Sequence, residues 1–441
     1  MKRTINYLFV VSIFLSTLPA YGEMPETWTL QDCLDYAIEH NIQIQQSKIT
    51  YQSGQEDTKQ AKAQLFPSLT ASITQGFVNN PSKNVTTNNS YTGNYAVNAN
   101  WTLFDGNQRN NALKQQKLQN QIDELNIQQD ARDIRVAIVQ AFMQVLYAIE
   151  SVNISQKTVE VSESECNRSR NLLEAGSIAK VDLAQLESQL SSDRYQLVVA
   201  QTNLDNYKLQ LKQLLELDIT DEIEVVSPEI EEEDILSPLP AKEDVYAAAL
   251  SVMPEMRSSK LSIDVAKLET KKAKGSYYPT ISLNAGIGTG HLSGTTYTYG
   301  TQLWNQFNES IGLTVSIPIF ANRNNKTALN KAKYSEVSSQ LELLNTQKEL
   351  LSIVEGYYLD ATSAQTQYRS SKEKLVYVSQ SYDLTQQQFF LGMKNTVELL
   401  TEKNNYLVAQ QEVLQSKYMA LMSIELLNIY QDKPISWNSE Q

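Results

Sequence analysis

The chain contains the stretch AQLFPSL at residues 63–69, and a related stretch, GSYYPTI, occurs at residues 275–281. Both place an aromatic residue before a proline, and the residue before proline avoids helical backbone angles. A helical pattern therefore ends at this point. A period of two follows, in which Leu69, Ala71 and Ile73 alternate with polar neighbours. Such alternation is typical of a strand with one apolar face and one wet face.

Further landmarks recur in the same order and at a nearly constant spacing. WTLFDG at residues 101–106 is echoed by IPIFAN at 317–322, and LEAG at 173–176 is echoed by FFLG at 389–392. Several separated landmarks at one spacing indicate an internal repeat. The sequence therefore predicts two copies of one structural unit.

We place the two copies at residues 23–217 and 242–430. The predicted elements are a helix at 30–64, strands at about 67–78 and 91–104, a long helix at 107–174 and a return helix at 179–217, then a helix at 242–275, strands at about 279–290 and 310–320, a long helix at 323–390 and a return helix at 394–430. Each long helix contains no proline and would extend about 100 Å at 1.5 Å per residue. A helix of that length must pack in a coiled-coil barrel or bundle.

Three segments lie outside the repeats. Residues 1–22 are predicted to be a secretory signal peptide, because Lys2 and Arg3 precede an apolar run and a small-residue cleavage site follows. The apolar run is too short for a membrane anchor of about 20 residues. The acidic segment 218–241 is either a solvated linker or an ordered belt on the helices. Residues 431–441 form the C-terminal tail.

The composition excludes several function classes. The 441 residues include 37 Lys+Arg and 50 Asp+Glu, and the net charge of −13 would repel a nucleic acid. The two cysteines and two histidines are far apart, which excludes a zinc cluster, and neither a glycine-rich phosphate loop nor a Ser-His-Asp order is present. We expect no catalytic residues, no cofactor and no metal site. Cys33 and Cys166 are expected to be buried, and a disulfide between them stays open because export permits one.

The strands require partner chains if they enter a membrane. The smallest membrane barrels have eight strands, and an open edge in lipid leaves backbone groups unpaired. Three chains with four strands each would supply twelve. Aromatic residues at the strand–helix junctions favour a lipid-facing girdle, although each one alone has the alternative of being an ordinary buried aromatic. The girdle candidates are Phe66, Phe104, Tyr277, Tyr278 and Phe320.

The signal peptide, the duplicated layout, FPSL at 66–69 and FDG at 104–106 together resemble the TolC-like outer membrane efflux protein (OEP) family. The resemblance covers essentially the whole mature chain. It implies an α+β membrane protein, a homotrimer with a 12-stranded β-barrel in the outer membrane of a Gram-negative-type cell and a long α-helical coiled-coil tunnel in the periplasm. It also implies a periplasmic adaptor (membrane fusion) protein and an inner-membrane pump as partners, contact with outer-membrane lipids, and passive export in efflux or type I secretion.

The resemblance also implies a gate near the helix reversals. Glu398 falls on a ring carboxylate of the family and Asp182 on a gate aspartate. Lys394 replaces a gate arginine, Phe389 replaces a gate tyrosine, and Thr401 stands where a second ring carboxylate is found. The implied gate is a ring of Glu398 side chains with a latch between Lys394 and Asp182, weaker than one made by arginine. The alternative is that these are solvated helix-end residues.

Gly176 and Gly392 mark the two reversals, since glycine readily takes turn conformations that other residues resist. The tips around them are candidates for adaptor contact. A second function remains open: a structural coiled-coil periplasmic tether or surface fibre without a channel. That alternative does not account for the strands, so the sequence favours a passive channel gated at its periplasmic helix tips.

Overall fold

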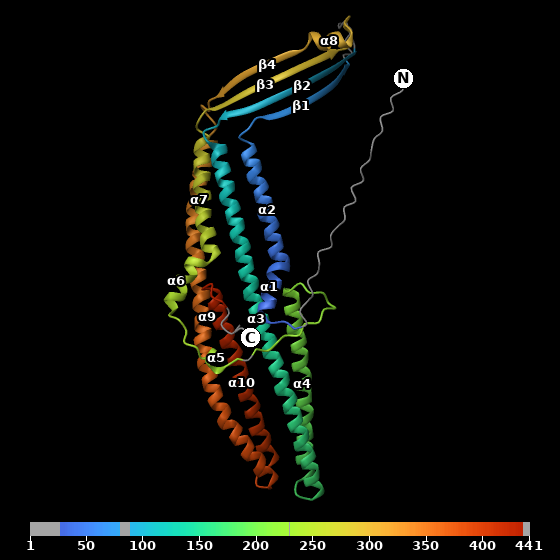
Figure 1. The fold of residues 1–441 in the computed structure, drawn as a ribbon, viewed down its shortest axis with the longest axis vertical. Coiled ribbons are helices and arrows are strands. Elements are labelled where there is room, and N and C mark those ends of the chain that lie inside the picture. Colours follow the sequence, from blue (N-terminus) through green and yellow to red (C-terminus); the bar gives the residue numbers. More distant parts are fainter. Residues whose placement is uncertain (1–26, 80–88, 229, 435–441) are drawn as a thin grey trace, which may run out of the picture.

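The computed structural model describes residues 27–79, 89–228 and 230–434. The predicted signal peptide at 1–22 and the tail residues 435–441 lie outside this part of the chain. The molecule is elongated, with a sheet at one end and helices that run from it to two hairpin tips at the other (Figure 1).

The elements of the described residues follow the duplicated order. In chain order they are α1 (Leu30–His40), α2 (Ile42–Ala63), β1 (Ser68–Asn79), β2 (Asn89–Phe104), α3 (Gln108–Glu174), α4 (Lys180–Leu214), α5 (Glu232–Ile235), α6 (Lys242–Val252), α7 (Pro254–Gly275), β3 (Thr280–Leu292), α8 (Tyr299–Asn305), β4 (Asn308–Ser316), α9 (Asn324–Phe390) and α10 (Thr396–Ile429).

The first helix of each copy is broken in two, so the single helices expected at 30–64 and 242–275 are wrong. Asn41 and Met253 both have φ near −60° and ψ of 129°, which is extended backbone. The Asn41 side chain accepts hydrogen bonds from the Gln43 and Ile44 N–H groups and so starts α2. Met253 precedes Pro254, and proline disfavours helical angles in the residue before it.

These breaks let shorter helices stack end to end beside the long ones. Asn41 Nδ2 donates to the Leu214 carbonyl at 3.3 Å, and the Ile42 N–H donates to Glu216 Oε1 at 3.3 Å. The start of α2 therefore meets the end of α4, and both lie against α3. In the second copy, α7 and α10 lie along α9 in the same way (Figure 1).

The sheet is antiparallel in the order β1-β2-β3-β4. β4 stops at Ser316, short of the expected range 310–320, because Pro318 has no N–H to donate to a ladder. The segment between β3 and β4 contains the short helix α8. Gln302 of α8 accepts the Leu292 N–H at 2.8 Å, which satisfies an amide beyond the last residue paired with β4.

The register places apolar side chains on one face of the sheet. Ile73 pairs with Tyr95, Val97 pairs with Ile287, and Ile311 lies further along the same face opposite Ala285. The other face carries Ser, Thr, Asn and Gly residues. Ile73 is 74 % exposed and Ile311 is 79 % exposed. An apolar face as exposed as this indicates that another molecule or a lipid covers it.

The main core lies halfway along the helices, where the stacked ends meet. Trp28, Phe142 and Leu146 are completely or almost completely buried there. Trp28 forms a parallel bridge with Val225 of the acidic segment, whose Ile235 is also buried. Between the two possibilities for residues 218–241, the structure therefore has the packed belt. Among described residues, α3 has the one stretch apolar and long enough to cross a membrane, and 44 % of that stretch is buried in the protein.

Truncating the core should destabilise the helical region. Phe142→Ala removes a side chain that is 0 % exposed, and we expect it to lower the free energy of unfolding by about 3–5 kcal/mol. Lys157→Ala on α3, where the side chain is exposed, is the control and should change it by less than about 0.5 kcal/mol. Denaturant midpoints of the purified protein measure both, and equal shifts would contradict this location of the core.

Candidate channel gate at the helix tips

The two hairpin tips are built alike. α3 turns into α4 through Gly176, and α9 turns into α10 through Gly392, with φ of 74° and 73°. The next residue donates back to the helix end in each case, from the Ser177 N–H to the Leu172 carbonyl and from the Met393 N–H to the Gln388 carbonyl. Glycine takes this left-handed backbone without strain, so Gly176 and Gly392 determine where the two helices reverse.

Glu398 helps to cap the start of α10. Its Oε2 accepts the Asn395 N–H at 3.1 Å, while the Glu398 N–H donates to Asn395 Oδ1 at 2.9 Å, which forms a capping box. Lys394 Nζ donates to Glu398 Oε1 at 2.6 Å. The hydrogen bond from Lys394, together with that backbone N–H, lowers the pKa of Glu398. The carboxylate therefore stays ionised to a lower pH than an isolated glutamate.

Asp182 occupies the matching position at the start of α4. It accepts the Ala179 N–H at 3.1 Å, and its other oxygen accepts the Thr396 hydroxyl at 2.8 Å, which joins the two tips. Among the described residues Lys394 does not pair with Asp182, because its ammonium reaches Glu398. Lys394 stands in the turn two residues before α10 begins, and Glu398 lies in the first turn of that helix.

Phe389 lies inside the tip and not on its surface. It is 3 % exposed and packs edge-on against Phe390, with ring centroids 5.4 Å apart. The Arg168 guanidinium lies over the Phe390 ring at 3.7 Å. In the single chain, Phe389 therefore belongs to the core between the hairpins.

The tips expose apolar side chains in an otherwise polar region. Val181 beside the first reversal is 62 % exposed, and around the second Leu391 is 74 %, Met393 is 70 % and Val397 is 60 % exposed. Exposed apolar residues gathered at one end of a molecule are typical of an interaction site.

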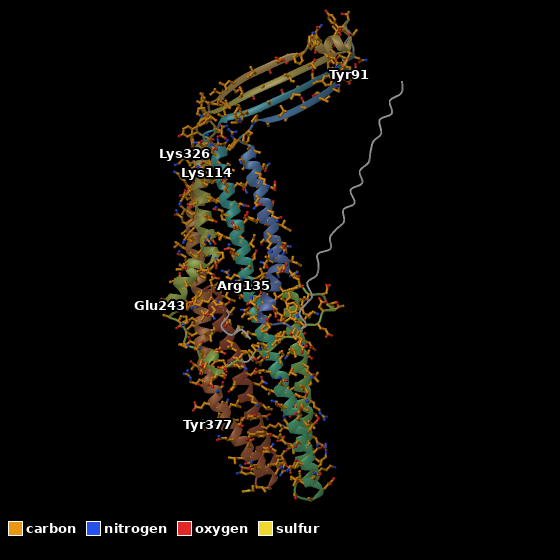
Figure 2. All side chains as sticks on the ribbon, in the orientation of Figure 1. Tyr91, Lys114, Arg135, Glu243, Lys326 and Tyr377 are labelled. Carbon is orange, nitrogen blue, oxygen red and sulfur yellow. The ribbon has the colours of Figure 1, made fainter. Side chains whose placement is uncertain are left out.

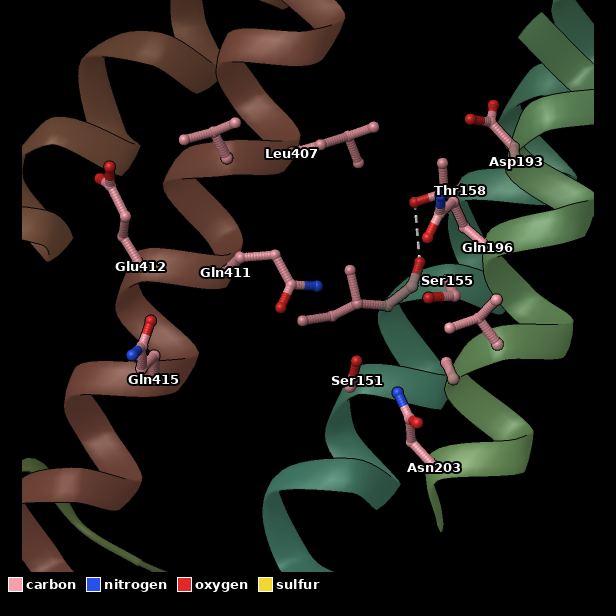
Figure 3. Close-up of a pocket in the computed structure, with 14 residues that line it drawn as sticks. Ser151, Ser155, Thr158, Asp193, Gln196, Asn203, Leu407, Gln411, Glu412 and Gln415 are labelled. Atoms are coloured by element: carbon pink, nitrogen blue, oxygen red, sulfur yellow. Dashed lines mark hydrogen bonds between the residues drawn. The ribbon is translucent and has the colours of Figure 1, made fainter. Parts of the chain in front are cut away.

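A groove of about 430 Å³ runs along α3 between α4 and α10. Its lining mixes polar side chains, such as Thr158 on α3 and Gln411 on α10, with apolar ones, such as Leu407 on α10. Figure 3 shows Gln411 extending from α10 toward α3. The two hairpins are therefore incompletely packed against each other on this side.

Sequence reasoning missed a buried charged network next to this groove. Lys403 of α10 lies 3.0 Å from Glu165 Oε2 on α3 and 3.3 Å from Asp193 Oδ2 on α4. The Ser162 hydroxyl accepts from Lys403 and donates to Asp193. Tyr382 of α9 donates to Glu165 Oε1 at 2.7 Å, and burial raises the pKa of that phenol. Removing one member of such a buried set typically costs about 3–5 kcal/mol.

The aromatic candidates lie where the strands meet the helices, and all five are exposed: Phe66, Phe104, Tyr277, Tyr278 and Phe320. At the other end of the sheet, Tyr91 and Trp304 are exposed as well, and Figure 2 shows Tyr91 there. The exposed rings at both ends of the apolar face have the placement of an aromatic girdle.

The two cysteines, for which a disulfide stayed open, are not paired with each other. Cys33 and Cys166 are free thiols, both buried, and burial raises the pKa of each. The described residues hold no group of His, Cys, Asp and Glu side chains able to bind a metal ion.

Comparison with known proteins identifies the family. The family model described as "Outer membrane efflux protein" matches residues 33–216 and 245–427. The chain is 21% identical to the outer membrane efflux protein BepC of Brucella suis, over 97% of this chain and 90% of BepC. It is also 21% identical to the outer membrane protein TolC of Escherichia coli, over 97% of this chain and 86% of TolC.

The fold is also that of a solved channel. The crystal structure of CusC, described as forming a transmembrane channel, superposes with a TM-score of 0.79 at 16% identity and covers 92% of each chain. These similarities confirm the predicted fold, with four strands and two long helices per chain, together with the outer-membrane location and the channel function over the tether. The family is one of channels rather than enzymes. With its two copies matched one after the other, this chain belongs to the outer membrane efflux protein family.

Proposed function

We propose that this channel exports its substrate passively from a periplasmic adaptor and an inner-membrane pump, and that its conductance is controlled at the helix tips. The observation that carries the proposal is the four-stranded sheet, which has one exposed apolar face and two unpaired edge strands above two helical hairpins. Three such sheets close a ring without edges, and the helices below them continue the passage.

The adaptor is proposed to contact the tips through their exposed apolar residues. The exposed apolar side chains here are Leu391 and Val397 beside the second reversal and Val181 beside the first. Contact with the adaptor would remove them from water. A photo-reactive amino acid at position 391, introduced in cells, should cross-link this chain to a periplasmic adaptor protein. The same group at the exposed Leu341, on α9, should not.

Glu398 is proposed to set ion selectivity. Three copies around a narrow axis would form a negative ring that favours cations. Lys394 lies 2.6 Å from each carboxylate, so much of that charge is neutralised within the chain. The ring therefore acts as three close ion pairs and not as three bare charges.

The charge at the tip should decide selectivity in planar bilayers. Glu398→Gln leaves Lys394 unpaired, and we expect the cation-to-anion permeability ratio to fall several-fold. Lys394→Gln uncovers the carboxylate and should raise the ratio by a similar factor at pH 7. Unchanged ratios in both variants, with single-channel currents still present, would remove Glu398 from the gate.

The pH dependence follows from the lowered pKa of Glu398. Because Lys394 and the Asn395 N–H stabilise the carboxylate, the wild-type ring keeps its negative charge as the pH falls below the ordinary pKa of glutamate. In Lys394→Gln the pKa returns toward its ordinary value, so cation preference should disappear at a higher pH than in the wild type. Reversal potentials measured between pH 7 and pH 3 test this order, and the opposite order would contradict it.

The two faces of the sheet should tolerate charge differently. Ile311→Lys puts an ammonium on the apolar face of β4 and should cost about 2–4 kcal/mol of barrel stability where that face meets lipid. Ser310→Lys, on the opposite face of the same strand, should insert normally. Heat-resistant trimers on gels of outer-membrane fractions report the difference, and equal loss for both variants would argue against a lipid-facing sheet.

A further inference from the structure

The short helix α8 lies at the end of the sheet that is far from the long helices (Figure 1). It packs on β3, and its side-chain contacts show which face of the sheet it covers. The Thr289 hydroxyl donates to the Leu303 carbonyl. The Tyr299 hydroxyl lies 3.0 Å from that of Tyr95, and the Tyr299 ring packs edge-on against His291 with centroids 4.8 Å apart.

The sheet residues in these contacts belong to the exposed apolar face. Thr289 and His291 stand two and four residues beyond Ile287 on β3, and Tyr95 pairs with Ile73. Side chains two residues apart on a strand point to the same face. Helix α8 therefore lies on the face that carries Ile73 and Ile287, which is the side toward lipid when the sheet is in a membrane.

The apolar face changes its character at the level of α8. On β3 the aliphatic Ile287 is followed on this face by Thr289, which pairs with Tyr95. On β4 Ile311 is preceded on this face by Glu309, whose side chain is exposed. An ionised carboxylate is costly in hydrocarbon, whereas tyrosine and tryptophan gather at the headgroup level. The hydrocarbon layer therefore ends at this level, and α8 lies at its edge.

The side of α8 that points away from the sheet presents an exposed tryptophan. Tyr299 and Gln302 face the sheet, and Gln302 is 8 % exposed. Trp304 follows two residues later, about 200° around the helix, and is 82 % exposed. A Cβ at Gly300, one turn before Trp304, would meet nothing within 4 Å. Among the described residues, this side of α8 is therefore open.

We propose that α8 anchors the sheet at the membrane interface of the leaflet away from the long helices, with the Trp304 ring in the lipid headgroup region. A tryptophan ring combines a large apolar surface with an N–H donor, which suits that region. Helix α8 rests on β3 and reaches β2 through Tyr95, away from the free edge of β4 where a neighbouring chain would pair. Lipid is therefore the partner that Trp304 meets. The proposal rests on the apolar face of the sheet meeting lipid.

Quenching of fluorescence by brominated lipids tests the depth of Trp304. The purified protein, with Trp101→Phe and Trp437→Phe, is placed in phosphatidylcholine vesicles that carry bromine either near the headgroup or near the end of the acyl chain. Trp28 is 1 % exposed in the helical core, and its emission is subtracted with a variant that also carries Trp304→Phe. We expect the shallow bromine to quench Trp304 about twofold more than the deep bromine.

The matched control is Leu313→Trp in the protein that carries Trp304→Phe. Leu313 is 62 % exposed on the apolar face, nearer the middle of β4, so the deep bromine should quench this tryptophan more than the shallow one.

The anchor is overturned if the control is quenched as expected while Trp304 is not quenched, or is quenched no more by the shallow bromine than by the deep one. Acrylamide, a quencher in water, then distinguishes a ring in solvent from a ring covered by protein. Absence of quenching at both positions would overturn the lipid-facing sheet together with the anchor.

Discussion

An antiparallel sheet with two open edges and one apolar face is unstable both in water and in lipid. The rest of this structure depends on how those edges and that face are covered. β1 and β4 each leave a row of backbone groups without partners in the chain. In lipid those groups must be paired by other strands. Copies of the same chain supply them, and the apolar face then meets the membrane. The sheet thus requires partner chains, and their arrangement determines which sides of the helices meet a neighbour.

The helices run from the sheet to the tips, and they are well packed at the level where the shorter helices end and begin. α3 and α9 are continuous over 67 residues each, while their partners are divided at the level of the core. Trp28 and the acidic segment pack into the core at that level, beside the break at Asn41. A break would otherwise expose orphan backbone groups. The belt therefore stabilises the place where the stacked helices meet.

Local sequence signals predicted most of this fold, because turns, strand alternation and helix ends depend on neighbouring residues. Pro67, Gly176 and Gly392 fixed boundaries in this way. The break at Asn41 was missed, since the cap bonds that create it lie inside an uninterrupted helical pattern. The end of β4 could have been predicted from Pro318, which has no N–H for a ladder. Helix α8 was missed because its segment is rich in Ser, Thr and Gly, which favour loops. Lys403 could not be recognised from the sequence, because its partners lie on other helices. The residue at the same place in the first copy, Glu187, does not form such a network and pairs with Arg170 near the surface.

The two charged groups of the tip differ in a way that suits them to different tasks. The Lys394–Glu398 pair is about 40 % exposed and joins the turn before α10 to the first turn of that helix, so it can rearrange at little cost when ions or partners approach. The Lys403 network is dehydrated and joins four helices, so its separation costs far more. Of the two groups, the exposed pair is therefore the one suited to respond to charge at the end of the channel. Glu398 and Lys403 both lie on α10, with Glu398 in its first turn and Lys403 just beyond.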